Sequence, residues 1–302
     1  MYVASTDGYA DRDLSFAYLK GLLVPWHQTT GLTPDRAWDL ARRVEDHLAG
    51  SGRDRISLEE LRDLAREVLG EAEGDATVER FRRWHEFATL DRPVVVLIGG
   101  ASGVGKSTVA TQLAQHLGIT RVSSTDFIRQ VLRSVVPDVI APELSRSSFE
   151  LDRSHDGAAP HAEFDRQVQQ VLVGVGAEIQ RAVNEGMSII LEGIHLLPGL
   201  VDAQAVTDGL VVEVVLTVED QDDHERRFAV RAGASGRPAE RYDDGLEAIR
   251  SLQEYVVGNA RGIGTPVIDN RHEDATVRDV LDVVFAAVDG ARRTRAPEPA
   301  PR

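Results

Sequence analysis

The segment that most constrains the fold is residues 100–107, which fit the pattern Gly, four free positions, then Gly-Lys-Ser. Residues 94–98 before it form an apolar, β-branched run of strand length. Residues 108–117 after it carry apolar side chains at helical spacing. Loops of this pattern bind phosphate where they connect a strand to a helix, and here both a predicted strand and a predicted helix flank the loop. The segment predicts a phosphate-binding loop in an α/β domain.

The residue types of this loop suit ATP. Glycines turn backbone N–H groups toward a phosphate, and the following helix adds its own unpaired N–H groups. Lys106 is expected to bridge the outer two phosphates, and the Ser107 hydroxyl to ligate Mg²⁺. Among 34 basic residues only Lys20 and Lys106 are lysines. Position 106 therefore has a lysine in a chain that otherwise uses arginine almost throughout, and a compact ammonium suits a phosphate site. The predicted ATP-binding residues here are Gly100, Ser102, Gly103, Val104, Gly105, Lys106, Ser107 and Thr108.

Composition excludes several classes of protein. The formal net charge of −15 argues against a nucleic-acid binder, which needs a basic surface. The absence of cysteine excludes disulfides, thiol catalysis and cysteine-ligated metals. No apolar run reaches the length of a membrane span, so we expect a cytoplasmic protein with no membrane partner. The sequence leaves a homo-oligomer possible.

Residues 1–90 are predicted to form a separate helical domain. A first helix begins after Thr33, whose side chain is expected to cap it, and ends at Gly50. Residues 57–60 form a capping box for a second helix that ends near Gly70. A third apolar pattern of helical period follows over residues 78–87, and Pro93 is expected to mark the boundary.

Residues 91–290 are predicted to form the α/β domain, and two of its strands end in carboxylates. Asp126 follows a short strand at residues 120–124, and Glu192 ends a buried strand that we expect beside the first. Asp126 is expected to act on an acceptor hydroxyl or to hold Mg²⁺ through water, with helix capping as the structural alternative. Glu192 is a candidate for the Mg²⁺ shell or for acceptor positioning. Arg129 and His195 are candidate acceptor contacts.

Three further segments complete this domain. Residues 137–160 are predicted to be an irregular excursion in which Ser147 and Ser148 contact the acceptor, followed by a long helix at residues 161–185. Residues 219–242 are dense in arginine and predict a lid over ATP, in which Arg227 and Arg231 share a helical face and stabilise the transferring group. A solvated salt-bridged helix is the alternative. Asn270 ends the last strand, where adenine is expected, and residues 291–302 are predicted to be a disordered tail.

Taken together, these segments resemble the 2-phosphoglycerate kinase family. The most discriminating are the stretches Glu-Gly-Ile-His-Leu-Leu-Pro-Gly from Glu192 and Gly-Arg-Pro-Ala-Glu-Arg-Tyr from Gly236. The resemblance implies a P-loop fold with helices on both sides of a parallel sheet, and transfer of the γ-phosphoryl group of ATP to 2-phosphoglycerate. An anionic acceptor of this kind would need local cations, for which Arg129, Arg146 and Arg241 are candidates.

The N-terminal region resembles an ATP-cone, a small nucleotide-sensing domain, at residues 14–16, Lys20 and residues 31–45. A structural or substrate-covering role is the alternative there. In the acceptor loop, this chain has Arg-Ser-Ser-Phe at residues 146–149 where the family tends to have a Tyr-Ser-Ser-Tyr-like sequence. A P-loop kinase for another small hydroxy acid or phosphorylated metabolite therefore stays an alternative. A non-catalytic ATP-binding regulator and a kinase for RNA ends are the remaining alternatives.

Overall fold

The structure is a computed structural model that describes residues 2–4, 32–53, 55–151, 161–201, 206, 208–235 and 245–295. The chain divides into two compact units, Met1–Thr89 and Leu90–Arg302. Of the residues that carry the ATP-cone resemblance, residues 14–16, Lys20 and Gly31 lie outside the described ranges.

The first unit packs helices around one small apolar core. Strands β1 (Tyr2–Ala4) and β2 (Arg55–Ser57) pair in parallel. The helices are α2 (Pro34–Ser51), α3 (Leu58–Leu69) and α4 (Glu71–Ala88), as the apolar periodicity predicted. Their buried faces meet through Leu40, Val44, Leu61, Val78 and Phe81, among others.

The ends of these helices test the capping predictions. The capping box is confirmed: Ser57 Oγ accepts from Glu60 N at 3.2 Å, and Glu60 Oε2 accepts from Ser57 N at 2.9 Å. The prediction for α2 is wrong in two details. Thr33 is the N-cap residue, but its side chain makes no capping hydrogen bond. The helix also continues beyond Gly50, because Gly52, with φ of 63°, supplies the left-handed residue that ends it.

The second unit is built on a parallel sheet with the strand order β4-β5-β3-β6-β7. Strands β5 and β6 flank β3, so Glu192 lies beside the first strand as predicted. Because every strand runs in the same direction, their carboxyl ends gather at one edge, where open α/β sheets bind ligands. The strands are β3 (Val94–Gly99), β4 (Val122–Ser124), β5 (Ile189–Glu192), β6 (Leu210–Thr217) and β7 (Val267–Asp269).

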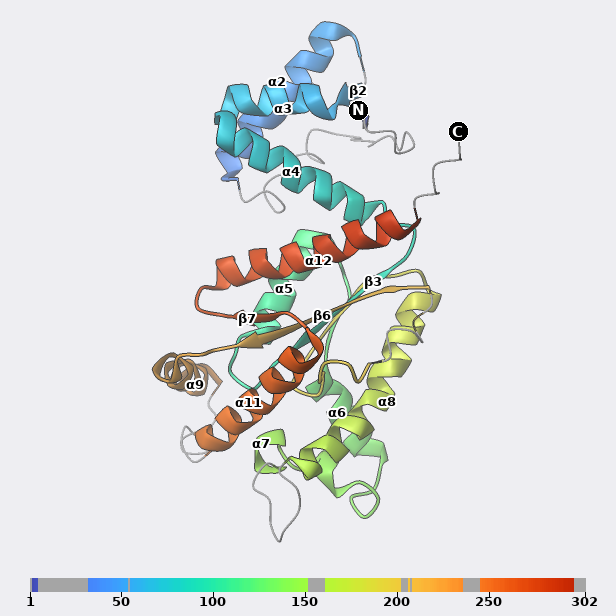
Figure 1. Ribbon diagram of the computed structural model, residues 1–302, viewed down its shortest axis with the longest axis vertical. Coiled ribbons are helices and arrows are strands. Elements are labelled where there is room, and N and C mark those ends of the chain that lie inside the picture. Colours follow the sequence, from blue (N-terminus) through green and yellow to red (C-terminus); the bar gives the residue numbers. More distant parts are fainter. Residues whose placement is uncertain are drawn as a thin grey trace. The chain divides into compact units, whose positions relative to one another are not determined.

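Helices cover both faces of this sheet (Figure 1). Helices α5 (Lys106–Leu117) and α12 (Glu273–Arg295) lie on one face, and α8 (Ala162–Asn184) and α11 (Leu246–Ile263) lie on the other. Helix α6 (Thr125–Val135) packs against α8. One buried cluster of this unit joins the sheet to α8 through Val95, Leu97, Ile189, Leu191, Val171, Val175 and Ile179.

The structure can be compared with two segments that the sequence predicts to be irregular. Residues 137–151 contain a 3-10 turn (Pro142–Ser145) and a one-turn helix α7 (Ser148–Leu151), and residues 152–160 lie outside the described ranges. The prediction of a tail from residue 291 is wrong for residues 291–295, since α12 continues to Arg295. Ala291 is buried and Thr294 Oγ1 donates to Gly290 O, which extends the helix. Residues 296–302 are outside the described part.

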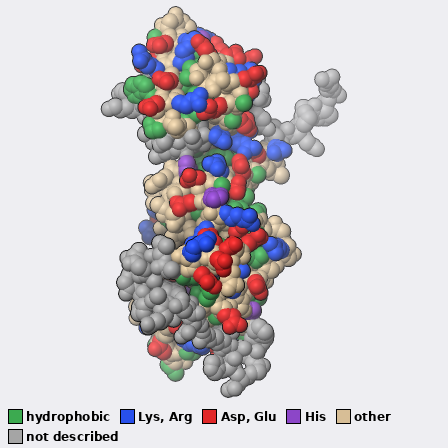
Figure 2. All heavy atoms as spheres, turned by 90° about the vertical axis from the view of Figure 1, so that its left-hand side faces the viewer, with side chains coloured by type: hydrophobic (Ala, Val, Ile, Leu, Met, Phe, Trp, Pro, Cys, Tyr) green, Lys and Arg blue, Asp and Glu red, His purple; other side chains and the backbone are tan. Residues whose placement is uncertain are grey.

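The surface of the described residues mixes both signs of charge. Acidic and basic side chains are interspersed over the face shown in Figure 2. None of the helices that the structure describes combines the length and the apolar character that crossing a bilayer requires.

The capping box gives the first prediction. Replacing Ser57 by Ala should lower the free energy of local unfolding of α3 by about 1 kcal/mol, because Glu60 N loses its acceptor. Native-state hydrogen exchange of the α3 amides measures this change. Thr33→Ala is the matched control in α2, since Thr33 occupies the same cap position without a side-chain bond. Equal losses in both helices would contradict the prediction.

Candidate active site

The predicted phosphate-binding loop connects β3 to α5 at the edge where the strands end. Gly105 is the N-cap residue of α5, with φ of 87°, so the helix begins at Lys106 with its first N–H groups facing the loop. Lys106 Nζ donates to Ala101 O at 2.7 Å, which holds the ammonium over the loop. The geometry is that of an anion site formed by backbone N–H groups, a helix N-terminus and one lysine.

The two residues expected at the metal lie together. Ser107 Oγ donates to Glu192 Oε1 at 2.8 Å, and Glu192 is only 8% exposed at the end of β5. A hydroxyl and a carboxylate are the oxygen ligands that Mg²⁺ prefers, and Mg²⁺ usually adds substrate phosphates and water to few protein ligands. Within the described ranges, no group of three or more His, Asp or Glu could hold a metal. The donor set present here therefore fits Mg²⁺ bound together with a polyphosphate.

Helix α9 (Gln221–Ser235) contacts the loop through two residues that sequence analysis missed. His224 is fully buried, and its Nε2 donates to Ser102 O at 2.9 Å. Burial lowers the pKa of His224, so the ring is a neutral N–H donor. Its ring stacks on Phe228, whose Cζ would lie 2.6 Å from a Cβ at Gly103. Gly103 therefore has to be glycine, both for this contact and for its φ of 82°.

Arg227, from the same helix, also reaches the loop region. Its Nε donates to Asp223 Oδ2 at 2.9 Å, and its NH2 donates to Asn270 O. Arg226 pairs with the same Asp223 at 3.2 Å but is 71% exposed. The start of α9 thus has ion pairs of the kind expected for a solvated, salt-bridged helix. The acidic partner, Asp223, precedes both arginines in the sequence. The side chain of Arg231, and all of Arg237 and Arg241, lie outside what the structure describes.

Asn270 holds the phosphate-binding loop through a side-chain hydrogen bond. It is buried, and its Nδ2 donates to Val104 O at 2.8 Å. Thr276 Oγ1 donates to its Oδ1, also at 2.8 Å, so the amide is fixed at both ends. Its buried side chain packs under Gly105, where an added Cβ would lie 2.4 Å from Asn270 Nδ2. Thr108, in contrast, is exposed on the first turn of α5.

Asp126 lies in the first turn of α6 with 73% of its side chain exposed. The alternative that it caps the helix is wrong, because Ser124 Oγ accepts from Phe127 N and fills that role. Arg129 Nε is 3.6 Å from Asp126 Oδ1. The Arg129 NH1 group donates to the carbonyls of Leu144 and Arg146, so this arginine also holds the chain before α7.

The other proposed acceptor contacts are buried or partly buried. His195 is fully buried with both ring nitrogens in hydrogen bonds, and the Ser148 hydroxyl is part of the same network. Ser147 N donates to Glu150 Oε2, which caps α7. Arg146, which stays partly exposed, pairs with Glu163 Oε2 at 2.5 Å.

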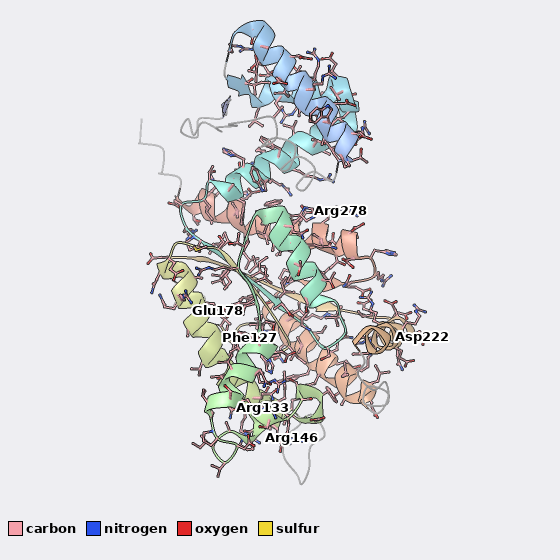
Figure 3. All side chains as sticks on the ribbon, turned by 180° about the vertical axis from the view of Figure 1, so that it is seen from behind. Phe127, Arg133, Arg146, Glu178, Asp222 and Arg278 are labelled. Atoms are coloured by element: carbon pink, nitrogen blue, oxygen red, sulfur yellow. The ribbon has the colours of Figure 1, made fainter. Side chains whose placement is uncertain are left out.

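These groups surround the loop on two sides. In Figure 3, Phe127 on α6 and Arg146 near α7 lie on one side of α5, and Asp222 at the start of α9 lies on the other. The site thus combines a phosphate-binding loop, a helix that contacts this loop, and a polar segment next to an exposed carboxylate. Such an arrangement can support transfer of a phosphoryl group from a nucleotide to an acceptor. The fold and the site define a P-loop kinase.

The chain belongs to the 2-phosphoglycerate kinase family. It is 35% identical to the 2-phosphoglycerate kinase of Methanococcus vannielii over 283 residues, covering 91% of this chain and 90% of that protein. It is 34% identical to that of Pyrococcus horikoshii over 90% of this chain and 91% of the other. Residues 95–255 match the family described as AAA domain. Among solved structures, a gluconokinase from Sinorhizobium meliloti 1021 has a TM-score of 0.44 at 16% identity, over 68% of this chain and 98% of its own.

The contact from α9 gives the second prediction. Replacing His224 by Leu should raise the KM for ATP about three- to tenfold, because Ser102 O loses a hydrogen bond that keeps the loop in its binding conformation. The KM for the acceptor should not change. Steady-state kinetics measures both constants, and His47→Leu, on the surface of the first unit, is the control. A change confined to the acceptor KM would show that α9 does not serve the nucleotide.

Proposed function

We propose that the protein transfers the γ-phosphoryl group of ATP to the free hydroxyl of 2-phosphoglycerate, giving 2,3-bisphosphoglycerate. The observation that carries this proposal is the similarity to curated 2-phosphoglycerate kinases over nine-tenths of both chains. The geometry supports it, because a nucleotide loop, an oxygen pair for a metal and an exposed carboxylate occur at one sheet edge.

Each group has a task in this reaction. The loop N–H groups and Lys106 bind the β- and γ-phosphates of ATP and stabilise charge as the phosphoryl group moves. Ser107 and Glu192 would hold Mg²⁺, which would supply further positive charge at the phosphate oxygens. Arg227 lies beside the loop and adds a cation from α9, and Arg231 is proposed to act with it.

Asp126 is the proposed base for the acceptor hydroxyl. It is exposed, stands at the carboxyl end of β4 and lies one strand away from Glu192. The acceptor brings about three negative charges, counting a phosphate and a carboxylate. In a protein with a net charge of −15 it needs local arginines, and Arg129, Arg146 and Arg241 are the candidates.

The acceptor is tested by an ATP-consumption assay across 2-phosphoglycerate, 3-phosphoglycerate, glycerate and other small hydroxy acids. We expect 2-phosphoglycerate to give the highest kcat/KM, and phosphorus NMR to show the bisphosphorylated product. Lys106→Ala is the inactive control. Its turnover should fall on the order of 10³-fold, because one preorganised electrostatic group is lost. A higher kcat/KM for glycerate would refute the proposal and leave a kinase for a less charged acid.

The two carboxylates should separate by role. Asp126→Asn keeps the shape and removes the base, so kcat should fall with little change in the KM for ATP. Glu192→Gln should instead raise the Mg²⁺ concentration needed for half-maximal rate, because Ser107 loses its anionic partner. Metal titrations of both variants make the comparison. Identical titration curves would contradict this division of roles.

A further inference from the structure

Four buried polar side chains meet between α6, α7, α8 and the loop after β5. They are Thr125, Ser148, Gln167 and His195, and none is more than 8% exposed. Buried polar groups are costly unless they are paired, so a cluster of four requires a reason. Each one comes from a different element, and the network therefore ties these elements together.

The orientation of Gln167 sets the direction of every hydrogen bond in the cluster. Its Nε2 donates to Glu143 O at 2.5 Å and to Arg146 O at 3.0 Å. Carbonyls only accept, so the NH₂ group faces them and Oε1 faces the other way. Oε1 accepts from Ser148 Oγ at 2.9 Å and from His195 Nε2 at 3.0 Å.

His195 is consequently a neutral ring with its proton on Nε2. An amide oxygen cannot donate, so Nε2 must carry the hydrogen, and Nδ1 accepts from Thr125 Oγ1 at 2.7 Å. Burial lowers the pKa of His195 to about 4, which keeps the ring in this form near neutral pH. The donors and acceptors of the cluster thus match in a single arrangement.

One end of the network lies next to the two proposed catalytic-site carboxylates, and the other end lies next to the proposed acceptor contacts. Thr125 directly precedes Asp126, and Gly193 directly follows Glu192. A Cβ at Gly193 would lie only 1.8 Å from Thr125 Oγ1, so the backbone after Glu192 touches the start of α6. At the other end, Gln167 binds the carbonyls of the segment that holds Ser147 and Ser148.

We propose that Gln167 is a positioning residue that, through His195 and Thr125, fixes residues 143–148 relative to Asp126 and Glu192. This inference rests on the proposed function in one respect, namely that this segment borders the acceptor. Arg129 binds Arg146 O from the side of α6, and Gln167 binds it from α8. The segment is therefore held by its backbone carbonyls from two neighbouring helices.

Kinetics of a matched pair of variants tests this role. Gln167→Met keeps the volume and removes both polar atoms, and the acceptor KM should rise on the order of tenfold with the ATP KM unchanged. Gln253→Met is the control, because Gln253 is also a buried glutamine with two backbone hydrogen bonds, both to Val218. It should lose stability without changing the acceptor KM. An equal rise in the acceptor KM in both variants would overturn the inference.

The hydroxyl of Thr125 allows a rescue experiment. Thr125→Val removes the donor to His195 and should raise the acceptor KM, whereas Thr125→Ser keeps the donor and should restore it. Nitrogen-15 NMR of the imidazoles should show His195 as a neutral Nε2–H ring in the wild type and in Thr125→Ser. A ring protonated at Nδ1 in the wild type would contradict the proposed arrangement.

Hydrogen exchange separates this inference from the proposed function. Amides of residues 141–151 should exchange faster in Gln167→Met than in Gln253→Met, whichever acceptor the enzyme uses. If 2-phosphoglycerate is not phosphorylated, the proposed function fails, but the exchange result still decides whether Gln167 holds the segment. Unchanged exchange in Gln167→Met would refute the positioning role even if 2-phosphoglycerate is the substrate.

Discussion

The hydrogen bond from Ser107 to Glu192 joins the helix that follows the nucleotide loop to the end of β5. This bond exists because β5 pairs directly with β3, so that the end of β5 lies beside the loop that follows β3. The chain reaches β5 only after β4 and α8, so a long crossover has to form before the two oxygens meet. Since one oxygen comes from the helix that follows β3 and the other from the end of β5, the proposed metal site depends on the correctly paired sheet.

The same edge is held together largely by side chains that bind backbone carbonyls. Asn270 binds Val104, His224 binds Ser102, and Gln167 binds Glu143 and Arg146. Carbonyls in loops have no partner in a regular ladder, so buried amides and imidazoles satisfy them. The loops around the site therefore keep defined conformations although they lie outside helices and strands.

Much of this could be predicted from sequence, because strand, loop and helix patterns are local. The strand that ends in Glu192 follows from an apolar run, and the edge that it shares with the strand ending in Ser124 follows from parallel pairing. The burial of His195 could not be predicted, since a position after a strand does not determine where the side chain points. Gln167 carried a signal that was missed: it lies on the apolar face of α8, three residues after Phe164 and one before Val168. A polar residue on such a face has to find a buried partner.

The network around His195 contains no charged side chain, and this affects how the enzyme responds to salt. Attraction between a phosphorylated acceptor and exposed arginines is weakened by dissolved ions, whose screening length is about 8 Å at physiological ionic strength. Hydrogen bonds between neutral groups in the interior are not screened in this way. Rising salt should thus reduce affinity for the charged substrate while the scaffold that shapes its pocket stays assembled, so that assembly of the site and attraction of its ligand respond to different physical variables.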